Sequence, residues 1–444
     1  MLVNVLIAMA ELCLNAPVFI ASSSDLLPER DLAELILAKF ASRAAQCRLL
    51  LPTFRWENKH YAASGPPQHG LNLKLERAEL VIMLFWSRMG EGTLEEMDRA
   101  LAQAHRGVTD NVAIYFKTQQ PSPSAEGFAA VEALRQRLNA EKRALTWQFE
   151  TIDDFKRLLK QHLINWFYRW QGVADACQFA LENSTPIRAT YNDGENRVRE
   201  AEFRFAFTDF PDLVQLLGRL AIERYQRDGM EALDQPLPRD RMDHCDARWP
   251  QLVAPETEQL LAVTHRAAAS GIPYWSPCPL RARENGEICF ADPEWFCFFC
   301  GIGLCHAILE SRVEVVCQRP YPNAVHQYVR GCANRLNLNL SKPLIDWLTG
   351  ADGRTRALPV ARNFAAYELG MLEAFDAQEA LGDALEHDSG KDVGTYCITS
   401  LGKLRSRLFL PRLVQRFQME QTSGRRLLLA QAISRIVGVA QYDL

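Results

Sequence analysis

The run Leu80-Val-Ile-Met-Leu-Phe-Trp86 constrains the fold more than any other segment of this chain. It is almost wholly apolar, which is the pattern of a strand buried on both of its faces. Strands of this kind occur in parallel sheets whose two faces are covered by helices. The run therefore predicts an α/β module around it.

Strand and helix patterns alternate on both sides of this run. Further strands are expected at 17–21, 48–56, 112–116 and 146–149, and helical patterns at 93–106, 125–141, 152–168 and through Leu32, Leu35, Ile36 and Phe40. Such alternation predicts one parallel sheet wrapped by helices. We assign residues 1–168 to this first domain.

Beyond residue 168 the alternation stops and no internal repeat is evident. A hairpin is expected at 185–207, with Asn192-Asp-Gly194 at its turn, and a helix at 209–227. Residues 229–252, with two prolines and many charges, are expected to be a linker or surface excursion. The middle region, residues 169–390, is predicted to be mainly helical and to serve in sensing or assembly, with a fold that the sequence does not define.

The final segment, residues 391–444, is basic and helical. Its motif Tyr396-Cys-Ile-Thr-Ser-Leu-Gly402, followed by Lys403, Arg405 and Arg407, resembles the strand-to-helix step at the end of winged-helix domains, with Thr399 as the helix cap. A winged helix here could bind DNA through residues 396–426, or serve only in dimerisation. The basic residues could equally form a solvated helix face.

The composition is that of a soluble globular protein, with 48% hydrophobic residues and a net charge of −4, so overall charge indicates no polyanionic partner.

No apolar run is long enough to span a membrane. The apolar start has no basic residue and is interrupted by Glu11, which argues against a signal peptide. Twelve cysteines, spread along the chain, favour reduced thiols. A cytoplasmic location without membrane attachment is expected.

Three loops carry the candidate site, namely those that follow the strands expected at 17–21, 48–56 and 80–86. Ligands of open parallel sheets bind outside the carboxyl ends of the strands, where these loops should meet. Small residues and free amides suit a phosphate, arginine suits a pyrophosphate, and tryptophan can stack on a flat base, so we predict a nucleotide substrate, most simply a dinucleotide. The expected substrate-binding residues are Ser22 and Ser23 (phosphate), Arg55 (substrate charge), Trp56 (base), Glu57 (ribose), Arg88 (pyrophosphate) and Thr93.

Glu96 is the expected catalytic carboxylate. Cleavage of a ribose–nicotinamide bond passes through an oxocarbenium-like state, which one carboxylate beside the anomeric carbon can stabilise. Thr93-Leu-Glu-Glu96 is equally a capping-box pattern, in which Thr93 caps a helix and Glu96 bonds back to it, so both interpretations stay open from the residues alone. Glu95 is expected to be a solvated partner of the helix dipole.

A set of short motifs occurs in the order and spacing of a known family. The motifs are Phe19-Ile-Ala-Ser-Ser, Asp25, Glu29-Arg30, Arg55-Trp-Glu57, Pro67-Gln68, Asn72, Phe85-Trp-Ser-Arg-Met-Gly90, Gly92-Thr-Leu-Glu-Glu96, Tyr115-Phe116, Asp153-Asp-Phe155 and His162-Leu163. Together, over residues 17–167, they resemble a bacterial TIR-like domain-of-unknown-function family. The segment between the Ser-Arg-x-Gly and Gly-Thr motifs is shorter here than in that family, which bears on substrate identity and loop closure.

The resemblance implies a flavodoxin/TIR-like fold and an NAD(P)+ glycohydrolase that uses NAD as its substrate. Better-understood TIR relatives hydrolyse NAD with a glutamate on the helix after the third strand, and Glu96 matches that place. It also implies a role in antiphage defence, controlled by a C-terminal region that forms a homo-oligomer or binds a partner protein.

Two alternatives stay open. Gly-Thr-x-x-Glu also resembles a motif of nucleoside deoxyribosyltransferases, which implies glycosyl transfer. The other alternative is a non-catalytic regulator with a TIR-like association domain and a DNA-contacting winged helix. The chain has no Gly-x4-Gly-Lys-Ser/Thr phosphate loop, so an NTPase is not indicated.

The Cys297-Phe-Phe-Cys300 motif has a spacing that can contribute to a zinc site. The nearby Cys278, Cys289, Cys305 and His306 do not supply a second pair with that spacing. Cysteines among aromatic residues usually behave as small buried hydrophobes. No metal site is therefore expected.

Overall fold

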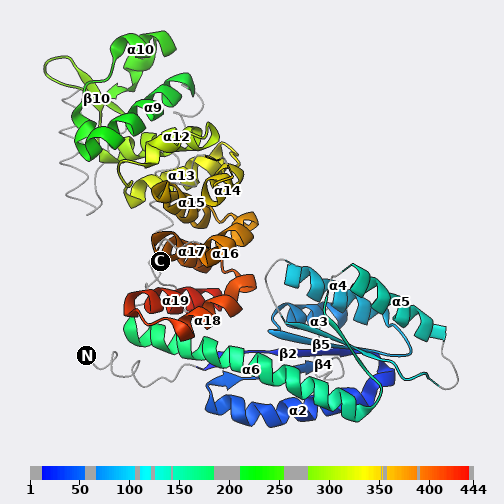
Figure 1. The fold of residues 1–444 in the computed structure, drawn as a ribbon. Coiled ribbons are helices and arrows are strands. Elements are labelled where there is room, and N and C mark those ends of the chain that lie inside the picture. Colours follow the sequence, from blue (N-terminus) through cyan, green and yellow to red (C-terminus); the bar gives the residue numbers. More distant parts are fainter. Residues whose placement is uncertain are drawn as a thin grey trace. The chain divides into compact units, whose positions relative to one another are not determined.

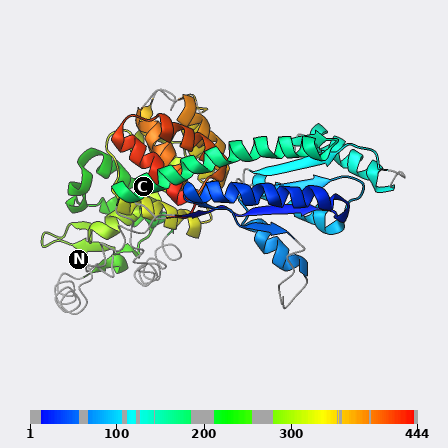
Figure 2. The ribbon, with the colours of Figure 1, turned by 90° about the horizontal axis from the view of Figure 1, so that it is seen from below.

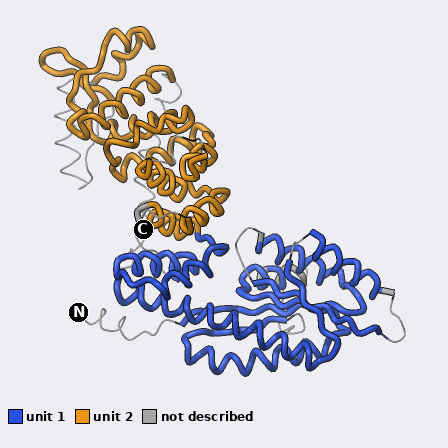
Figure 3. Tube along the Cα trace, in the orientation of Figure 1, with its two compact units in different colours: residues 1–187, 405–444 blue, residues 188–404 orange. Residues whose placement is uncertain are grey.

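The computed structural model describes residues 13–55, 67–105, 111–121, 126–141, 144–184, 211–254, 279–351, 353, 358–387 and 391–439. The chain forms two compact units (Figure 3), of which unit 1 comprises residues 1–187 and 405–444, and unit 2 residues 188–404. None of the described helices is both long enough and apolar enough to cross a membrane.

Unit 1 is built on a five-stranded parallel sheet (Figure 1). Its strands are β2 (Val18–Ser22), β4 (Thr53–Arg55), β5 (Leu80–Phe85), β6 (Val112–Lys117) and β7 (Thr146–Phe149). They stand in the order β4-β2-β5-β6-β7, and every pairing between neighbours is parallel. A short parallel pair, β1 (Leu14–Asn15) with β3 (Leu49–Leu50), adjoins it in sequence. The predicted α/β module with a parallel sheet is confirmed.

Helices cover both faces of this sheet. The helices α2 (Leu27–Gln46) and α6 (Ile152–Asn183) run side by side on one face (Figure 2). The opposite face carries α3 (Pro67–Glu76), α4 (Glu91–His105) and α5 (Glu126–Ala140) (Figure 1). Side chains alternate along a strand, so Met83 and Phe85 pack into the core beneath α3, α4 and α5, while Tyr115 of β6 meets Phe155 of α6 with ring centroids 5.3 Å apart.

The helix α6 joins the sheet to the end of the chain. It extends well beyond residue 168, where the sequence predicted a domain boundary. Its C-terminal half packs against α18 (Leu410–Met419) and α19 (Ser423–Ile436), with the rings of Phe179 and Phe417 5.7 Å apart. The C-terminal helices from residue 405 onward are therefore part of unit 1 rather than a separate domain.

Unit 2 is a succession of helices, each of which packs against helices that lie close to it in the chain. The helix α12 packs against α9 and α13, α15 packs against α14 and α17, and α16 packs against α17. Nearest-neighbour packing of this kind is typical of helical-repeat proteins. The helices are α9 (Pro211–Asp228), α10 (Arg239–Cys245), α12 (Pro293–Leu309), α13 (Asn323–Arg335), α14 (Ser341–Thr349), α15 (Pro359–Met371), α16 (Gln378–His387) and α17 (Lys391–Lys403).

One helix ending recurs along unit 2. Shortly after α12, α13 and α15, respectively, Ser311, Asn337 and Glu373 adopt a left-handed backbone with φ between 51° and 54°. The amide of the next residue then donates to the carbonyl five residues back, as in a Schellman motif: Arg312 to Ala307 (2.8 Å), Leu338 to Ala333 (2.9 Å) and Ala374 to Leu369 (3.0 Å). The repeat lies in turn geometry rather than residue identity, which is why the sequence showed none.

Residues 229–252 are not a linker. They fold into η2 (Gly229–Asp234), α10 and η3 (Trp249–Leu252), and lead to a small sheet of β8 (Val253–Ala254), β9 (Leu280–Ala282) and β10 (Ile288–Phe290). Trp249 and Leu252 are buried, so apolar packing holds the Pro-containing segment in place. The expected hairpin at 185–207 lies outside the described residues.

The prediction of a strand-to-helix step at 396–402 is wrong. Those residues lie inside one helix, α17, and within the described stretch 391–439 every regular element is helical. The hydroxyl of Thr399 donates to the carbonyl of Thr395 at 3.0 Å, as in a helix interior, and does not cap a helix. This stretch therefore offers no strands from which a wing could be built.

Candidate functional site

Polar side chains are buried where the strands of the unit 1 sheet end. The carboxyl ends of parallel strands meet at one edge of a sheet, so this edge gathers the loops after β2 and β5, the first turn of α2 and the first two turns of α4. We call the buried polar residues there the carboxyl-edge cluster: Ser22, Ser23, Glu29, Arg30, Ser87, Thr93 and Glu96, each less than 10% exposed.

Asp25 links the loop after β2 to the loop after β5. Its carboxylate accepts hydrogen bonds from the backbone amide of Ser87 (2.9 Å), from the hydroxyl of Ser87 (2.6 Å) and from the hydroxyl of Ser23. Partial burial raises the pKa of Asp25, but these hydrogen bonds outweigh it and hold the pKa below its usual value. Asp25 is therefore a charged anchor that fixes both loops.

A buried ion pair joins β6 to α2 beside these loops. Lys117 Nζ lies 2.8 Å from Glu29 Oε1 and 4.2 Å from the ring centroid of Trp86. The indole of Trp86 donates in turn to the carbonyl of Gln119 at 2.7 Å. Lys117 was not among the predicted site residues, although a charged residue at the end of the apolar run Val112–Phe116 is a usable signal for the ligand edge.

Glu96 lies on the face of α4 that packs against the sheet. The helix begins at Glu91, with the amide of Leu94 donating to the carbonyl of Gly90 at 3.1 Å, so Thr93 is not an N-cap and the capping-box interpretation is wrong. Glu96 is 6% exposed and shares its face with the core residue Ala100, one turn further along the helix. Apolar packing does not account for a carboxylate at such a position, because burying one is costly.

Glu95, the preceding residue, is exposed on the outer side of α4. Its carboxylate accepts hydrogen bonds from Asn72 Nδ2 (2.9 Å) and Arg99 Nε (3.0 Å), which lower its pKa. Two adjacent glutamates therefore have opposite environments, and Glu95 provides a matched control for Glu96.

The other expected site residues differ in where they lie and in what they contact. Arg55 lies at the end of β4, but its Nη1 pairs with Asp31 (2.7 Å) and Glu34 (2.9 Å) of α2, so its guanidinium is already neutralised by the protein. Trp56 and Glu57 lie outside the described residues. Arg88 is exposed in the short loop of residues 86–90, between β5 and α4.

Packing against α5 holds this short loop. A β-carbon added at Gly127 would lie 2.5 Å from the carbonyl oxygen of Ser87 and 3.0 Å from Cα of Arg88. The start of α5 thus rests directly on the loop backbone. This contact, together with Asp25, gives the loop a defined position at the strand edge.

The cysteine motif is buried in the core of unit 2. Cys297 and Cys300 lie on α12, and burial raises the pKa of the Cys297 thiol to about 12. Thiols held protonated in this way are poor metal ligands. Among the described residues, no three His, Cys, Asp or Glu side chains come together as a metal site; Cys278 is not one of those residues.

The basic residues near the C-terminus are largely engaged within the protein. Arg407 Nη1 lies 3.0 Å from Glu79 Oε2, and the guanidinium of Arg426 lies 4.9 Å and 4.8 Å from the ring centroids of Phe179 and Phe417. These contacts belong to the packing of α18 and α19 on unit 1. They leave the predicted DNA surface without two of its arginines.

No protein-family model, curated protein or solved structure matches this chain. The candidate site is accordingly defined by geometry and chemistry alone.

Proposed function

We propose that the unit 1 module hydrolyses the N-glycosidic bond of NAD or a related nucleotide, with Glu96 as the carboxylate that acts at the anomeric carbon. The observation that carries this proposal is the buried position of Glu96 among core residues, beside the strand edge at which parallel sheets bind ligands. A carboxylate in that position is shielded from water, as an active-site carboxylate has to be.

The proposed reaction needs no bound cofactor. The bond between C1′ of the ribose and nicotinamide breaks, and nicotinamide leaves with the bonding electrons as a neutral base. Glu96 stabilises the positive charge that develops on the sugar, and water then adds to C1′ with loss of a proton. We assign phosphate binding to the exposed Arg88 and to the strand-end loop that holds Ser22 and Ser23. The hydroxyls of these serines already donate to the carbonyl of Ser23 and to Asp25, so a phosphate would replace these acceptors.

The strand order supports the family resemblance. Numbered along the chain, the five strands stand in the order 2-1-3-4-5, which is the flavodoxin-like order with its ligand crevice between the first and third strands. We accordingly propose a TIR-like enzyme, acting in the cytoplasm in antiphage defence. Unit 2 would control it by sensing a signal or by assembling several copies of the chain.

The decisive experiment compares two glutamates on one helix. Purified full-length protein, Glu96→Gln and Glu95→Gln are incubated with NAD, and released nicotinamide is quantified by chromatography. We expect Glu96→Gln to lower the rate by about 10²-fold or more, while Glu95→Gln stays within about threefold, because its carboxylate is exposed and bonded to α3 and to its own helix.

The products separate the alternatives. A new nucleoside formed when a second base is added indicates glycosyl transfer in place of hydrolysis. Absence of nicotinamide release at every protein concentration, with salt-sensitive DNA binding that depends on Arg405 and Arg407, would favour the non-catalytic regulator. That regulator has less support, because Arg407 is engaged with Glu79.

A further inference from the structure

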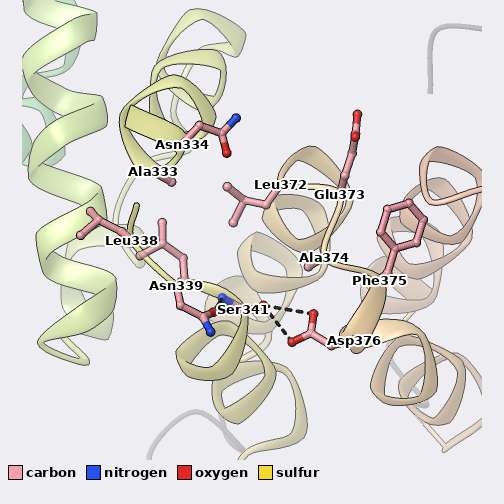
Figure 4. A pocket seen from close by; sticks show the side chains of 11 residues that line it. Ala333, Asn334, Leu338, Asn339, Ser341, Leu372, Glu373, Ala374, Phe375 and Asp376 are labelled. Carbon is pink, nitrogen blue, oxygen red and sulfur yellow. Dashed lines mark hydrogen bonds between the residues drawn. The ribbon is translucent and has the colours of Figure 1, made fainter. Parts of the chain in front are cut away.

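Unit 2 contains a pocket between two equivalent turns. Its volume is about 360 Å³, and it is lined by the turn after α13 and the turn after α15, which share the recurring helix ending (Figure 4). The polar and aromatic side chains around it are Asn334, Asn339, Ser341, Glu373, Phe375 and Asp376. None of these residues belongs to the carboxyl-edge cluster, so the pocket is a separate feature.

The electrostatics of this pocket favour a cation. Both carboxylate oxygens of Asp376 accept from one hydroxyl, that of Ser341, at 3.1 and 3.0 Å. No Lys, Arg or His side chain in the described part of unit 2 pairs with Asp376. The C-termini of α13 and α15 border the pocket, as does the N-terminus of α14 at Ser341. Because helix ends of both signs are present, the carboxylate of Asp376 decides the charge that the pocket favours.

The side chains that line the pocket favour a flat cation. Phe375 is a large aromatic residue that is 60% exposed at the pocket, close in sequence to the carboxylate of Asp376. A guanidinium group can stack on an aromatic face while it donates two hydrogen bonds to a carboxylate, which an ammonium group does less well. Glu373 on the same rim already pairs with Arg330 at 2.7 Å, so the protein itself uses this chemistry there.

We propose that this pocket binds an arginine side chain of a partner polypeptide. Stacked helical repeats present extended surfaces that suit an extended peptide rather than a small molecule. Asp376 would hold the guanidinium. The exposed ring of Phe375, which points away from this carboxylate in Figure 4, would turn to stack on it. The pocket thereby supplies a recognition surface for the unit to which we assign sensing.

The test uses fluorescein-labelled Gly-Gly-Arg-Gly-Gly and fluorescence anisotropy with the full-length protein. We expect the corresponding citrulline peptide, which is neutral, and the lysine peptide to bind at least about tenfold more weakly than the arginine peptide. Asp376→Asn should weaken binding of the arginine peptide about tenfold or more. Glu379→Gln, an exposed carboxylate three residues away that does not line the pocket, should change it less than about twofold.

A second variant addresses the aromatic contact. Phe375→Ala should reduce the preference for arginine over lysine, and because this side chain is mostly exposed the variant is expected to fold. Equal binding of the arginine and citrulline peptides, wild-type affinity in Asp376→Asn, or no binding at millimolar peptide would overturn the proposal. Arginine methyl ester binding as tightly as the peptide would overturn the assignment of a polypeptide partner.

Discussion

At the scale of single residues, the carboxyl-edge cluster shows how hydrogen bonds decide the state of a buried group. Asp25 is partly buried, which by itself disfavours its charge, yet three donors from Ser23 and Ser87 keep it ionised. Since two of these donors belong to the loop after β5, the charge of Asp25 also determines where that loop lies. Residue-level electrostatics therefore set the geometry around Glu96.

Asp25→Asn should destabilise unit 1 relative to the wild type, and this loss of stability should be larger at neutral pH than at acid pH. The folded-state pKa of Asp25 is lowered, so its contribution is complete above the unfolded-state pKa of about 4 and is lost as pH falls through the lowered folded-state value. At pH 7 the loss of charge-assisted hydrogen bonds is expected to cost about 1–3 kcal/mol.

Urea unfolding at pH 7 and at about pH 3 measures this difference. Ser87→Ala is the companion variant, and the double variant should be less destabilised than the sum of the two single ones, because the residues share hydrogen bonds. The same free-energy difference at both pH values would show that Asp25 does not carry a lowered pKa.

At the scale of secondary-structure elements, small residues set how closely the helices of unit 2 approach. A β-carbon at Gly303 of α12 would overlap the carbonyl oxygen of Gly218 on α9, and one at Gly301 would lie 2.5 Å from Cβ of Tyr328 on α13. The helix α12 is therefore in backbone contact with both neighbours. Its nearly uniform apolar sequence reflects burial on all sides rather than a membrane span.

Gly303→Ala should destabilise unit 2 by about 1–3 kcal/mol, because the added methyl group meets backbone atoms that cannot move independently of their helices. Gly331→Ala is the matched control. It lies within α13 with no atom within 4 Å of the new β-carbon, so it should stabilise by about 0.5–1 kcal/mol through helix propensity. Denaturant unfolding monitored by circular dichroism gives both values, and equal effects would contradict the close approach.

At the scale of the whole molecule, segments that are far apart in the sequence pack together in unit 1. The chain completes its parallel sheet by residue 149, builds unit 2, and then returns with α18 and α19 to pack on the extended α6 of unit 1. Unit 1 is therefore closed by residues more than 200 positions from its sheet. The ion pair of Arg407 with Glu79, which immediately precedes β5, belongs to the same packing.

Phe417→Ala should destabilise unit 1 while leaving unit 2 unchanged. Phe417 is 3% exposed and packs against Phe179 of α6, so its removal is expected to cost about 3–5 kcal/mol. Hydrogen exchange followed by mass spectrometry should show faster exchange in α6 and the sheet, with α12 and α13 unaffected. Phe375→Ala, at a site 60% exposed, is the control and should alter neither pattern; faster exchange confined to α12 would refute the assignment of α18 to unit 1.

The sequence by itself determined the parallel sheet and the edge at which its loops meet, because strand and helix periodicities are local and the apolar run at 80–86 demands burial on both faces. Only the tertiary structure decided that Glu96 faces the core, that Arg55 is occupied by Asp31 and Glu34, and that Thr399 lies inside a helix. The same holds for the recurring turns of unit 2 and the return of α18 and α19 to α6. These outcomes depend on which distant surfaces pack together, and a short sequence pattern carries no information about its partner in space.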